Sequence, residues 1–446
     1  MSSHLIWPAI YLLLHISVMV RVLVVEGKEP ASRAAWVVVL VFLPAVGIFA
    51  YILFGEPWVT FRSRRFADDT GEALALQMVH GPSADAQLPQ QFRSVFDICQ
   101  QLAGCPTVAG NRAELAADSN AAIDGMVRDF DAARQSIHVS FYIWLIDGNG
   151  LKVVNALLRA RHRGITCRVI ADGVGSRHLI RSRHWAAMRA AGVKLCISMK
   201  IWRGLVWAGN RVDLRNHRKI LVVDRNVGFV GGYNIGSLYA TQWRDTHVKV
   251  EGPAVWELTN AFVDFWNHYR GREHPTLADL GVTSWDSRVS AHINAPSLML
   301  FPVRGMYLDA INRASRRIWI TQGYFIPDAD MLEAFKVACG RGVDVRVLMP
   351  EVSNHVVADW LARGYYSELM AVGVQIWLYR DAMVHAKTIT VDGQWSSIGT
   401  ANIDRLSLTG NYEINLGVYS QELAAQMETI FANDLRNARR LDPERW

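Results

Sequence analysis

The chain repeats itself at a constant interval. RQSIHVSFYIW, which contains Ile137, matches SRRIWITQGYF, which contains Ile318. AAGVKLCIS, with Gly192, matches MAVGVQIWL, with Gly373, and the two glycines are separated by the same interval as the two isoleucines. Separate matches at one interval indicate a duplication in which each copy is a structural unit. We therefore expect two homologous halves.

Each half alternates short apolar runs with helical stretches. VRVL and ITVD are β-branched runs typical of buried strands, whereas LKVVNALLRARHRG and MLEAFKVACGRG have helical periodicity and end at a glycine. This alternation predicts an α/β fold in which helices cover mixed β-sheets, and duplicated halves usually share a site at their seam. We assign the halves to residues 111–290 and 291–446, after a membrane-anchoring segment at 1–60 and a connector at 61–110.

The membrane-anchoring segment holds two apolar stretches. Residues 5–25 contain one histidine and one arginine, and residues 34–54 contain no charged residue. Since about 20 apolar residues span the hydrocarbon layer of a bilayer, we predict a hairpin of two transmembrane helices. A cleaved signal peptide is the alternative for the first stretch, but no basic segment precedes it. The flanking charges favour a cytoplasmic body: Arg62, Arg64 and Arg65 after the second helix, against Lys28 and Arg33 before it.

A polar motif occurs once in each half. NHRKILVVDRNVGFVGGYNIG and VHAKTITVDGQWSSIGTANID both contain His-x-Lys, then an aspartate, a glycine and an asparagine at the same spacing. Because strand residues alternate sides, the imidazole and the ammonium group share one face, where one can react with a phosphate and the other can neutralise it. The candidate site residues are His217, Lys219, Asp224 and Asn234 in the first half, and His385, Lys387, Asp392 and Asn402 in the second.

An acidic residue follows each motif histidine at one spacing. The interval from His217 to Asp245 equals the interval from His385 to Glu413. We expect these carboxylates to hydrogen-bond the imidazoles and fix their tautomers, and the spacing pairs each acid with the histidine of its own half. Two motif aspartates stay open between a catalytic role and bracing of the turn after the strand: Asp224 and Asp392.

Charge and cysteine content limit which binding partners and bound metals the sequence predicts. The 47 lysines and arginines exceed the 41 acidic residues by six, which suits an anionic partner such as lipid phosphate or nucleic acid. Five scattered cysteines without a CxxC pair argue against a disulfide scaffold or a zinc site. We predict a reaction without metal or other cofactor, because the motif lysines already supply positive charge.

These residues resemble the signature of the phospholipase D superfamily, and within it the chain resembles the bacterial cardiolipin synthases. The similarity includes YILFGEP, FYIW, DGVGSR, WRDTHVKVEGP, GYFIPD and HAKT, and extends over nearly the whole chain. The resemblance implies two phospholipase D-like halves sharing one active site in a multi-pass protein of the bacterial cell membrane. It also implies a phosphatidyltransferase that forms cardiolipin and glycerol from two phosphatidylglycerol molecules.

The resemblance further implies roles for the motif residues. His217 would attack the phosphorus and form phosphatidyl-histidine, and His385 would be the general acid and base. Four residues would bind the phosphoryl oxygens: Lys219, Lys387, Asn234 and Asn402.

Three other functions are weighed against this one. A phospholipase D hydrolase would use the same intermediate with water as acceptor. A nuclease would suit the positive charge but gives no reason for two membrane spans, so we expect no nucleic-acid partner. A non-enzymatic membrane-binding protein is disfavoured by the intact motifs. The sequence makes no prediction of the oligomeric state.

The first half carries extra residues before its motif. The stretch from Gly192 to His217 is much longer than the matching stretch from Gly373 to His385. The additional segment contains Trp202 and Trp207 among basic residues, a composition that favours the lipid headgroup layer. We predict that these tryptophans contact lipid; the alternative is a surface loop packed on the body.

Overall fold

The protein is described here by a computed structural model, in which the described residues are 3–25, 30–55, 88–103, 107–116, 118–200, 214–270, 287–294 and 302–446. They belong to two units. The first comprises residues 1–65 with 200–214 and contains the N-terminal helices. The second comprises residues 66–199 with 215–446 and is called the catalytic body below.

Among its described residues, the N-terminal unit contains one helix long and apolar enough to cross a membrane. Helix α1 (Ser3–Val24) includes the 19-residue apolar stretch Ile6–Val24, whose side chains are mostly exposed. After it come α2 (Pro30–Phe42), α3 (Pro44–Ala50) and a π-helical turn η1 (Tyr51–Gly55). The second predicted transmembrane helix, over 34–54, is interrupted, because two shorter helices meet at Pro44; a second membrane span stays a prediction.

Proline explains this break. Pro44 has no N–H to donate to the preceding turn, and it disfavours helical geometry at Leu43, which has φ −130° and ψ 63°. The two pieces pack around a small cluster made by Val22, Leu40, Ile48 and Tyr51. The guanidinium of Arg33 donates hydrogen bonds to the carbonyl oxygens of Leu23 and Val25 at the end of α1. This interaction satisfies carbonyls that a helix end leaves without partners.

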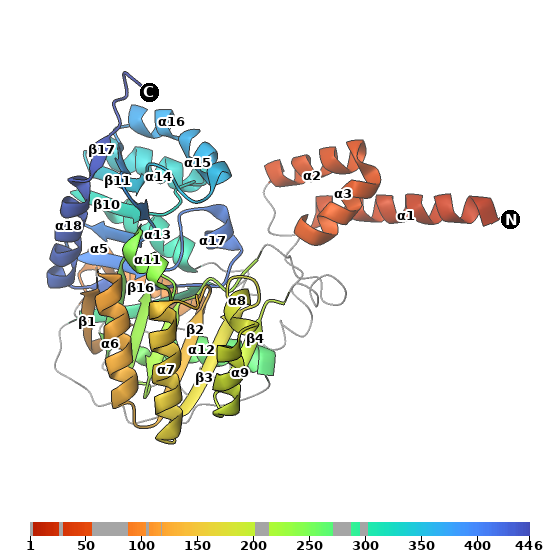
Figure 1. The fold of residues 1–446 in the computed structure, drawn as a ribbon. Coiled ribbons are helices and arrows are strands. Elements are labelled where there is room, and N and C mark those ends of the chain that lie inside the picture. The colour runs from red at the N-terminus through yellow and green to blue at the C-terminus, as the bar shows by residue number, and fades with distance from the viewer. Residues whose placement is uncertain are drawn as a thin grey trace. The chain divides into compact units, whose positions relative to one another are not determined.

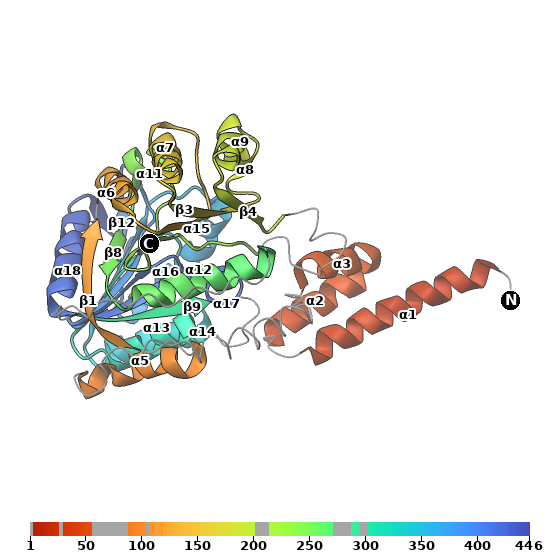
Figure 2. The same cartoon turned by 90° about the horizontal axis from the view of Figure 1, so that it is seen from below.

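The catalytic body is built on a long mixed sheet to which each half contributes one side (Figure 1). The first half has the strand order β1-β8-β6-β5-β2-β3-β4, and the second has β9-β16-β15-β14-β10-β11-β12-β17. The seven strands of the first order correspond to the first seven of the second, which adds β17 at its edge, and the halves meet where β1 pairs antiparallel with β9. Figure 2 shows helices on both faces of the sheet. The predicted α/β fold of two homologous halves with mixed β-sheets is confirmed.

The first half has the following strands and helices: β1 (Val108–Ala116), α6 (Ser119–Ala132), β2 (Ser136–Phe141), α7 (Gly148–His162), β3 (Thr166–Asp172), α8 (Arg177–Ile180), α9 (Arg183–Ala190), β4 (Lys194–Ser198), β5 (Ile220–Val223), β6 (Val227–Gly231), α11 (Ser237–Thr241), β7 (Trp243–Arg244), β8 (His247–Glu251) and α12 (Val255–Arg270).

The second half repeats this series except that its two-residue strand, β13, precedes the motif strand and that β17 is added at the end: β9 (Ser287–Asn294), α13 (Pro302–Arg313), β10 (Arg317–Gln322), α14 (Ala329–Gly340), β11 (Asp344–Pro350), α15 (Val356–Arg363), α16 (Tyr366–Ala371), β12 (Gln375–Tyr379), β13 (Met383–Val384), β14 (Lys387–Val391), β15 (Trp395–Gly399), α17 (Arg405–Thr409), β16 (Glu413–Tyr419), α18 (Gln421–Leu435) and β17 (Ala438–Arg440).

Glycine ends the helix before the second parallel strand in both halves. Gly164 after α7 and Gly342 after α14 both have a φ of +84°, in the left-handed region that glycine adopts without a steric penalty. The chain can then reverse into β3 and β11, which run parallel to β2 and β10. The predicted helix ends at the two RG sequences are thus confirmed.

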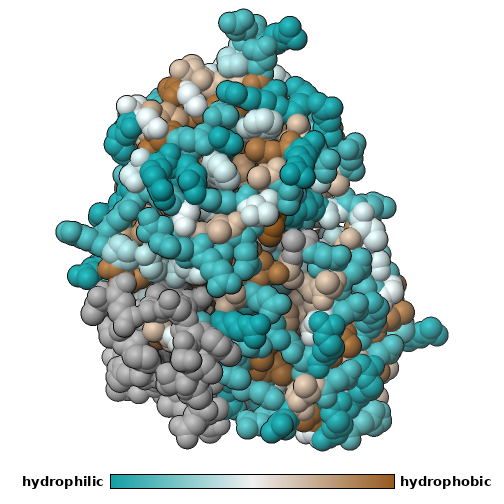
Figure 3. All heavy atoms as spheres, turned by 90° about the vertical axis from the view of Figure 1, so that its left-hand side faces the viewer, coloured by the Kyte–Doolittle hydropathy of each residue, from teal (hydrophilic) through white to brown (hydrophobic). Residues whose placement is uncertain are grey.

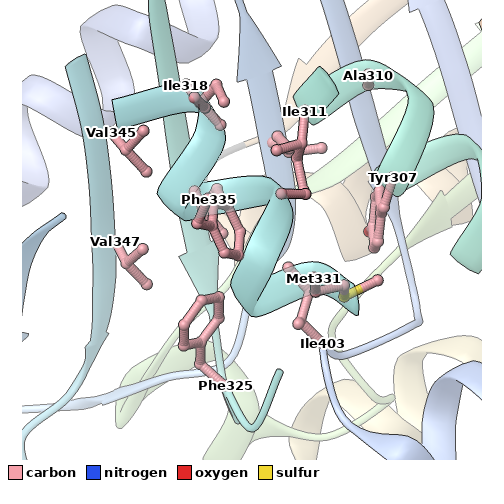
Figure 4. Packing of buried hydrophobic residues seen from close by; sticks show 14 of the residues in the cluster. Tyr307, Ala310, Ile311, Ile318, Phe325, Met331, Phe335, Val345, Val347 and Ile403 are labelled. Carbon is pink, nitrogen blue, oxygen red and sulfur yellow. The ribbon is translucent and has the colours of Figure 1, made fainter. Parts of the chain in front are cut away.

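The core of the second half lies between its sheet and helices α13 and α14. Figure 4 shows Phe335 of α14 against Phe325, Val345 and Val347, all of which are buried. Burial of a phenylalanine side chain stabilises a fold by about 1.5–3 kcal/mol. This packing holds β10 and β11 in place, and the ends of these strands approach the second motif.

The predicted connector at 61–110 is wrong at its end. Helix α5 (Gln90–Ala103) packs Phe92, Val95 and Phe96 into the core of the second half, and β1 begins at Val108. The spacing of these three apolar residues, i, i+3 and i+4, is that of a helix face against a core. The predicted boundary at 290/291 also falls inside β9, the counterpart of β1.

Candidate active site

The two motif histidines occupy equivalent places in the fold. His217 comes just before β5 and His385 just before β14, and each of these strands pairs antiparallel with the first strand of a parallel β-sheet segment. Lys219 and Lys387 follow at the strand starts, and both lysine side chains are fully buried. Each motif thus places its imidazole and its ammonium group at the start of one strand.

Each imidazole hydrogen-bonds the acid of the other half. Nδ1 of His217 lies 3.0 Å from both carboxylate oxygens of Glu413, and Nδ1 of His385 lies 2.8 Å from Oδ2 of Asp245. The pairing within each half that the spacing indicated is therefore wrong, although the same four residues make the two pairs. Each half supplies the partner that orients the other half's histidine, so neither half holds a complete site.

The backbone explains why the pairs cross. The N–H of His217 donates to the carbonyl of Tyr412, and the N–H of Tyr412 donates to the carbonyl of Arg215. At the other histidine, the N–H of His385 donates to the carbonyl of Arg244, where β13 and β7 pair in parallel. Each histidine segment therefore runs beside a segment of the opposite half. The acid is the residue that directly follows the bonded carbonyl in that segment.

The hydrogen bonds define the reactive nitrogen. Burial lowers the pKa of His385 to about 3 and also lowers that of His217, so both imidazoles are neutral at pH 7. Burial alone would raise the pKa of Asp245, but the hydrogen bond and charge of His385 hold it below its usual value. An ionised carboxylate accepts the Nδ1–H, which leaves the lone pair on Nε2 of each ring.

The two lysines place positive charge beside the histidines. Nζ of Lys219 donates to the carbonyl oxygen of His217 at 2.7 Å, and Lys387 makes the same contact with His385. Burial lowers the pKa of Lys219 to about 7 and that of Lys387 to about 8, despite the nearby carboxylates. A bound anion would hold both ammonium groups in the charged form.

The two asparagines lie in buried turns beyond the next strand. Oδ1 of Asn234 accepts a hydrogen bond from the N–H of Ile143. Nδ2 of Asn402 lies 3.4 Å from the hydroxyl of Ser407, while its Oδ1 has no partner within the part of the chain that the structure describes. Their predicted role in binding substrate oxygens stays a prediction.

The two motif aspartates brace turns away from the histidines. The carboxylate of Asp224 accepts hydrogen bonds from the backbone N–H groups before β2, and that of Asp392 accepts the equivalent bonds before β10. Both residues follow the far end of a strand, and both have φ in the left-handed region, 51° and 56°. A strand rises about 3.3 Å per residue, so Asp392 lies roughly 20 Å from His385. The catalytic interpretation is not supported; the structure shows the bracing role.

Three residues beside the histidines have no assigned role in the sequence analysis. The ring of Tyr142 lies edge-on to His217 at 5.3 Å, and the ring of Trp243 lies 4.8 Å from His385. Gly323 faces His385 so closely that a Cβ there would lie 3.3 Å from the ring carbon Cδ2. Tyr142 and Gly323 occupy matching positions of the repeat. The residue types differ there, and this difference is a signal that the sequence contains.

Two further predictions concern the loop tryptophans and the absence of a metal. Trp202 and Trp207 lie outside the described residues. Within the ranges that the structure describes, no group of three or more His, Cys, Asp or Glu side chains is arranged to hold a metal ion.

Comparison with known proteins connects this geometry to a family. Residues 126–266 and 307–435 match the family described as cardiolipin synthase, PLD-like domain, and residues 8–56 match the phospholipase D-nuclease N-terminal family. The chain is 30% identical to the cardiolipin synthase of Listeria monocytogenes serotype 4b strain CLIP80459, over 94% of this chain and 90% of that protein. The chain belongs to the cardiolipin synthase family.

Other cardiolipin synthases are similar over the same extent. The protein of Geobacillus kaustophilus is 31% identical over 95% of this chain and 87% of its own length. Cardiolipin synthase 1 of Bacillus anthracis is 30% identical over 94% of this chain and 85% of its own length. The resemblance that the motifs indicated is confirmed.

Solved structures share the fold of this cardiolipin synthase family member. Phosphatidylserine synthase of Haemophilus influenzae Rd KW20 has a TM-score of 0.60 at 15% identity, covering 78% of this chain and 92% of that chain. Polyphosphate kinase of Porphyromonas gingivalis has a TM-score of 0.52 at 12% identity, covering 75% and 49%. Identities this low establish the fold alone.

Proposed function

We propose that this protein is a membrane-bound phosphatidyltransferase that forms cardiolipin and glycerol from two phosphatidylglycerol molecules through a phosphatidyl-histidine intermediate. The crossed hydrogen bonds carry this proposal. In support, Glu413 and Asp245 each hydrogen-bond Nδ1 of an imidazole from the other half, and both motif lysines are buried. One imidazole can therefore attack a phosphodiester while the other handles protons.

In the first step, Nε2 of His217 attacks the phosphorus of the donor lipid. A P–N bond forms, the P–O bond to the headgroup glycerol breaks, and the departing oxygen takes a proton from His385. Burial keeps His385 neutral before substrate binds, but the negative phosphodiester favours its protonated form. Lys219 and Lys387, with Asn234 and Asn402, neutralise and position the phosphoryl oxygens.

In the second step, His385 removes the proton from a hydroxyl group of a second phosphatidylglycerol. The resulting oxygen nucleophile attacks the phosphatidyl group, which releases His217 and forms cardiolipin. One phosphodiester bond is exchanged for another, so the reaction needs no ATP. The side-chain exposure supports His217 as the nucleophile, since 13% of its side chain is exposed against 5% for His385.

We further propose that residues 1–60 anchor the protein as a multi-pass segment in the bacterial membrane, with the catalytic body on the cytoplasmic side. Helix α1 has the length and composition for one span. Helices α2 and α3 together supply a second apolar stretch, whose side chains are largely exposed. The basic residues after it support the orientation. Trp202 and Trp207 are proposed to contact lipid, because tryptophans among basic residues favour the headgroup layer.

The products distinguish transfer from hydrolysis. Full-length protein in phosphatidylglycerol vesicles should yield cardiolipin and glycerol in equal amounts, as measured by mass spectrometry. His217→Ala should abolish both products, whereas His162→Ala, at the exposed end of α7, is the matched control and should not. Phosphatidic acid without cardiolipin would mean that water is the acceptor and that the protein is a hydrolase.

A further inference from the structure

The exposed apolar side chains of the catalytic body concentrate around the active site. Ten large apolar side chains are exposed among its described residues. Eight of them lie in segments that follow directly after strands, at the edge of the sheet where the catalytic residues lie. These eight are Ile146, Leu238, Val352, Val356, Val357, Trp360, Leu361 and Leu406; the other two are Val337 and Trp446. Single exposed apolar residues are ordinary, but a concentration on one part of the surface indicates an interaction site.

Helix α15 contributes most of this surface. Val356, Val357, Trp360 and Leu361 are each more than half exposed, and their spacing i, i+1, i+4 and i+5 puts them on one face of the helix. Only Ala362 of this helix is buried. The helix thus turns an apolar face outward, where water would be an unfavourable neighbour.

The start of α15 is tied to the active site. Gln322 of β10 pairs with Lys387 in the register of the sheet, so the segment after Gln322 begins beside the catalytic lysine. Two residues later, the hydroxyl of Tyr324 donates to Asn354 and its ring contacts that of His355, the residue before α15. The apolar face of α15 therefore belongs to the rim of the site.

The corresponding segment of the first half is basic. Residues 173–198 contain no aspartate or glutamate, and three exposed arginines lie at or next to α8: Arg177, Arg181 and Arg183. Helices α8, α15 and α17 lie on one flank of the catalytic body, the right-hand flank in Figures 1 and 2. Hydrophilic residues cover most of the described surface on the opposite side (Figure 3).

We propose that α15 and the basic segment at α8 dock the rim of the active site onto the surface of an anionic lipid bilayer. The apolar face of α15 enters the boundary between headgroups and acyl chains, and the arginines contact lipid phosphates. This proposal rests on the proposed function, because a lipid substrate must reach the histidines without leaving the bilayer. Apolar and cationic groups on one flank match an anionic membrane better than a second copy of the same cationic surface.

The docking surface is tested by depth-dependent quenching. The full-length protein, with its five native cysteines replaced, receives a single cysteine by Val357→Cys in α15 or, as the matched control, by Val337→Cys in α14. Each is labelled with nitrobenzoxadiazole and reconstituted in nanodiscs of phosphatidylcholine and phosphatidylglycerol, with and without brominated acyl chains. The label at 357 should lose about half of its fluorescence, since an interfacial helix face lies roughly 5–10 Å deep, and the label at 337 should lose almost none.

Two results would overturn the proposal. Equal quenching of the two labels would mean that α15 does not enter the lipid. Disulfide-linked dimers of the unlabelled Val357→Cys protein under air oxidation, together with an unquenched label in the labelled protein, would mean that a second copy covers α15. Quenching needs no turnover, so a protein that makes no cardiolipin yet shows quenching at 357 would refute the proposed function and retain the docking surface.

A kinetic measurement provides the second, independent readout. Val357→Ser with Trp360→Ser should lower the rate on phosphatidylglycerol vesicles about tenfold and leave the rate on a short-chain, water-soluble donor unchanged. Val337→Ser should affect neither substrate. Equal losses on both substrates would assign α15 a structural role instead.

Discussion

Nδ1 of His217 lies 3.0 Å from both carboxylate oxygens of Glu413, although the two residues come from different halves of the duplicated chain. Asp245 and His385 form the reciprocal pair. Because each reactive imidazole depends on a carboxylate from the other half, the duplication gives a single site that only the assembled catalytic body completes. This dependence makes the acids as important as the histidines.

Glu413→Gln is expected to lower kcat by about 10²- to 10⁴-fold, because an amide neither stabilises an imidazolium nor fixes the Nδ1–H tautomer of His217. The initial rate of cardiolipin formation in vesicles measures the effect. Glu422→Gln, at an exposed position in α18, is the matched control and should retain the wild-type rate. A wild-type kcat for Glu413→Gln would show that the pair has no catalytic role.

The buried lysines predict a loss of activity at alkaline pH. The pKa of Lys219 is lowered to about 7, so its positive charge is present below pH 7 and disappears as the pH rises. We expect kcat/KM, which reports on the free enzyme, to fall from about pH 7 upward. In Lys219→Arg the fall should begin later, near the pKa of about 8 of Lys387, because arginine stays charged. An alkaline limb that is identical in the two proteins would contradict the assignment.

Asp392→Asn should impair stability rather than chemistry. The carboxylate accepts hydrogen bonds from backbone N–H groups at Ser315, Arg316 and Arg317, and loss of its charge should cost about 2–3 kcal/mol of unfolding free energy. Thermal unfolding in detergent measures this cost, and Asn keeps the left-handed φ accessible. These N–H groups also hold the pKa of Asp392 below its usual value, although burial opposes them. Its contribution is therefore present at neutral pH and lost as the pH falls through the lowered pKa. An unchanged melting temperature with a large drop in kcat would restore the catalytic interpretation.

Gly323→Ala should lower kcat with little effect on stability. The new Cβ would lie 3.3 Å from Cα and Cδ2 of His385 and 3.4 Å from Nζ of Lys387, so the imidazole must shift. Misplacement of a reacting group can cost about 10² in rate. Gly340→Ala at the end of α14 is the control, since a Cβ there meets nothing within 4 Å. Equal kcat values for the two variants would show that the ring of His385 tolerates the added methyl group.

The sequence predicts the repeat, the fold class and the residues that gather in the site, because each depends on local spacing that the duplication displays twice. The crossed pairing of Asp245 and Glu413 could not be derived in this way. Both acids follow the histidine of their own half at one interval, and this spacing is the same whether each acid reaches its own half or the other one. Only the pairing of segments from different halves decides between them.

Two features that the sequence analysis did not predict, the break at Pro44 and helix α5, had signals in the sequence. Pro44 stands in the middle of the second apolar stretch, and a proline there removes a helix hydrogen bond even though hydropathy stays high. Phe92, Val95 and Phe96 are spaced as one helix face, but the polar residues around them masked α5. The sequence also shows that Tyr142 and Gly323 differ at matching positions of the repeat. Only their contacts with the histidines give this difference a meaning.

The covalent intermediate tests the central claim most directly. His385→Ala keeps the nucleophile but lacks both the acid that protonates the departing glycerol and the base that activates the acceptor. The phosphatidyl adduct on His217 should therefore form slowly, persist because no acceptor discharges it, and accumulate during prolonged incubation with phosphatidylglycerol. Intact-protein mass spectrometry, followed by peptide mapping, detects the added mass and its position. His217→Ala should carry no adduct. An adduct on His217→Ala would reverse the roles of the two histidines, and the absence of an adduct on both variants would contradict covalent catalysis.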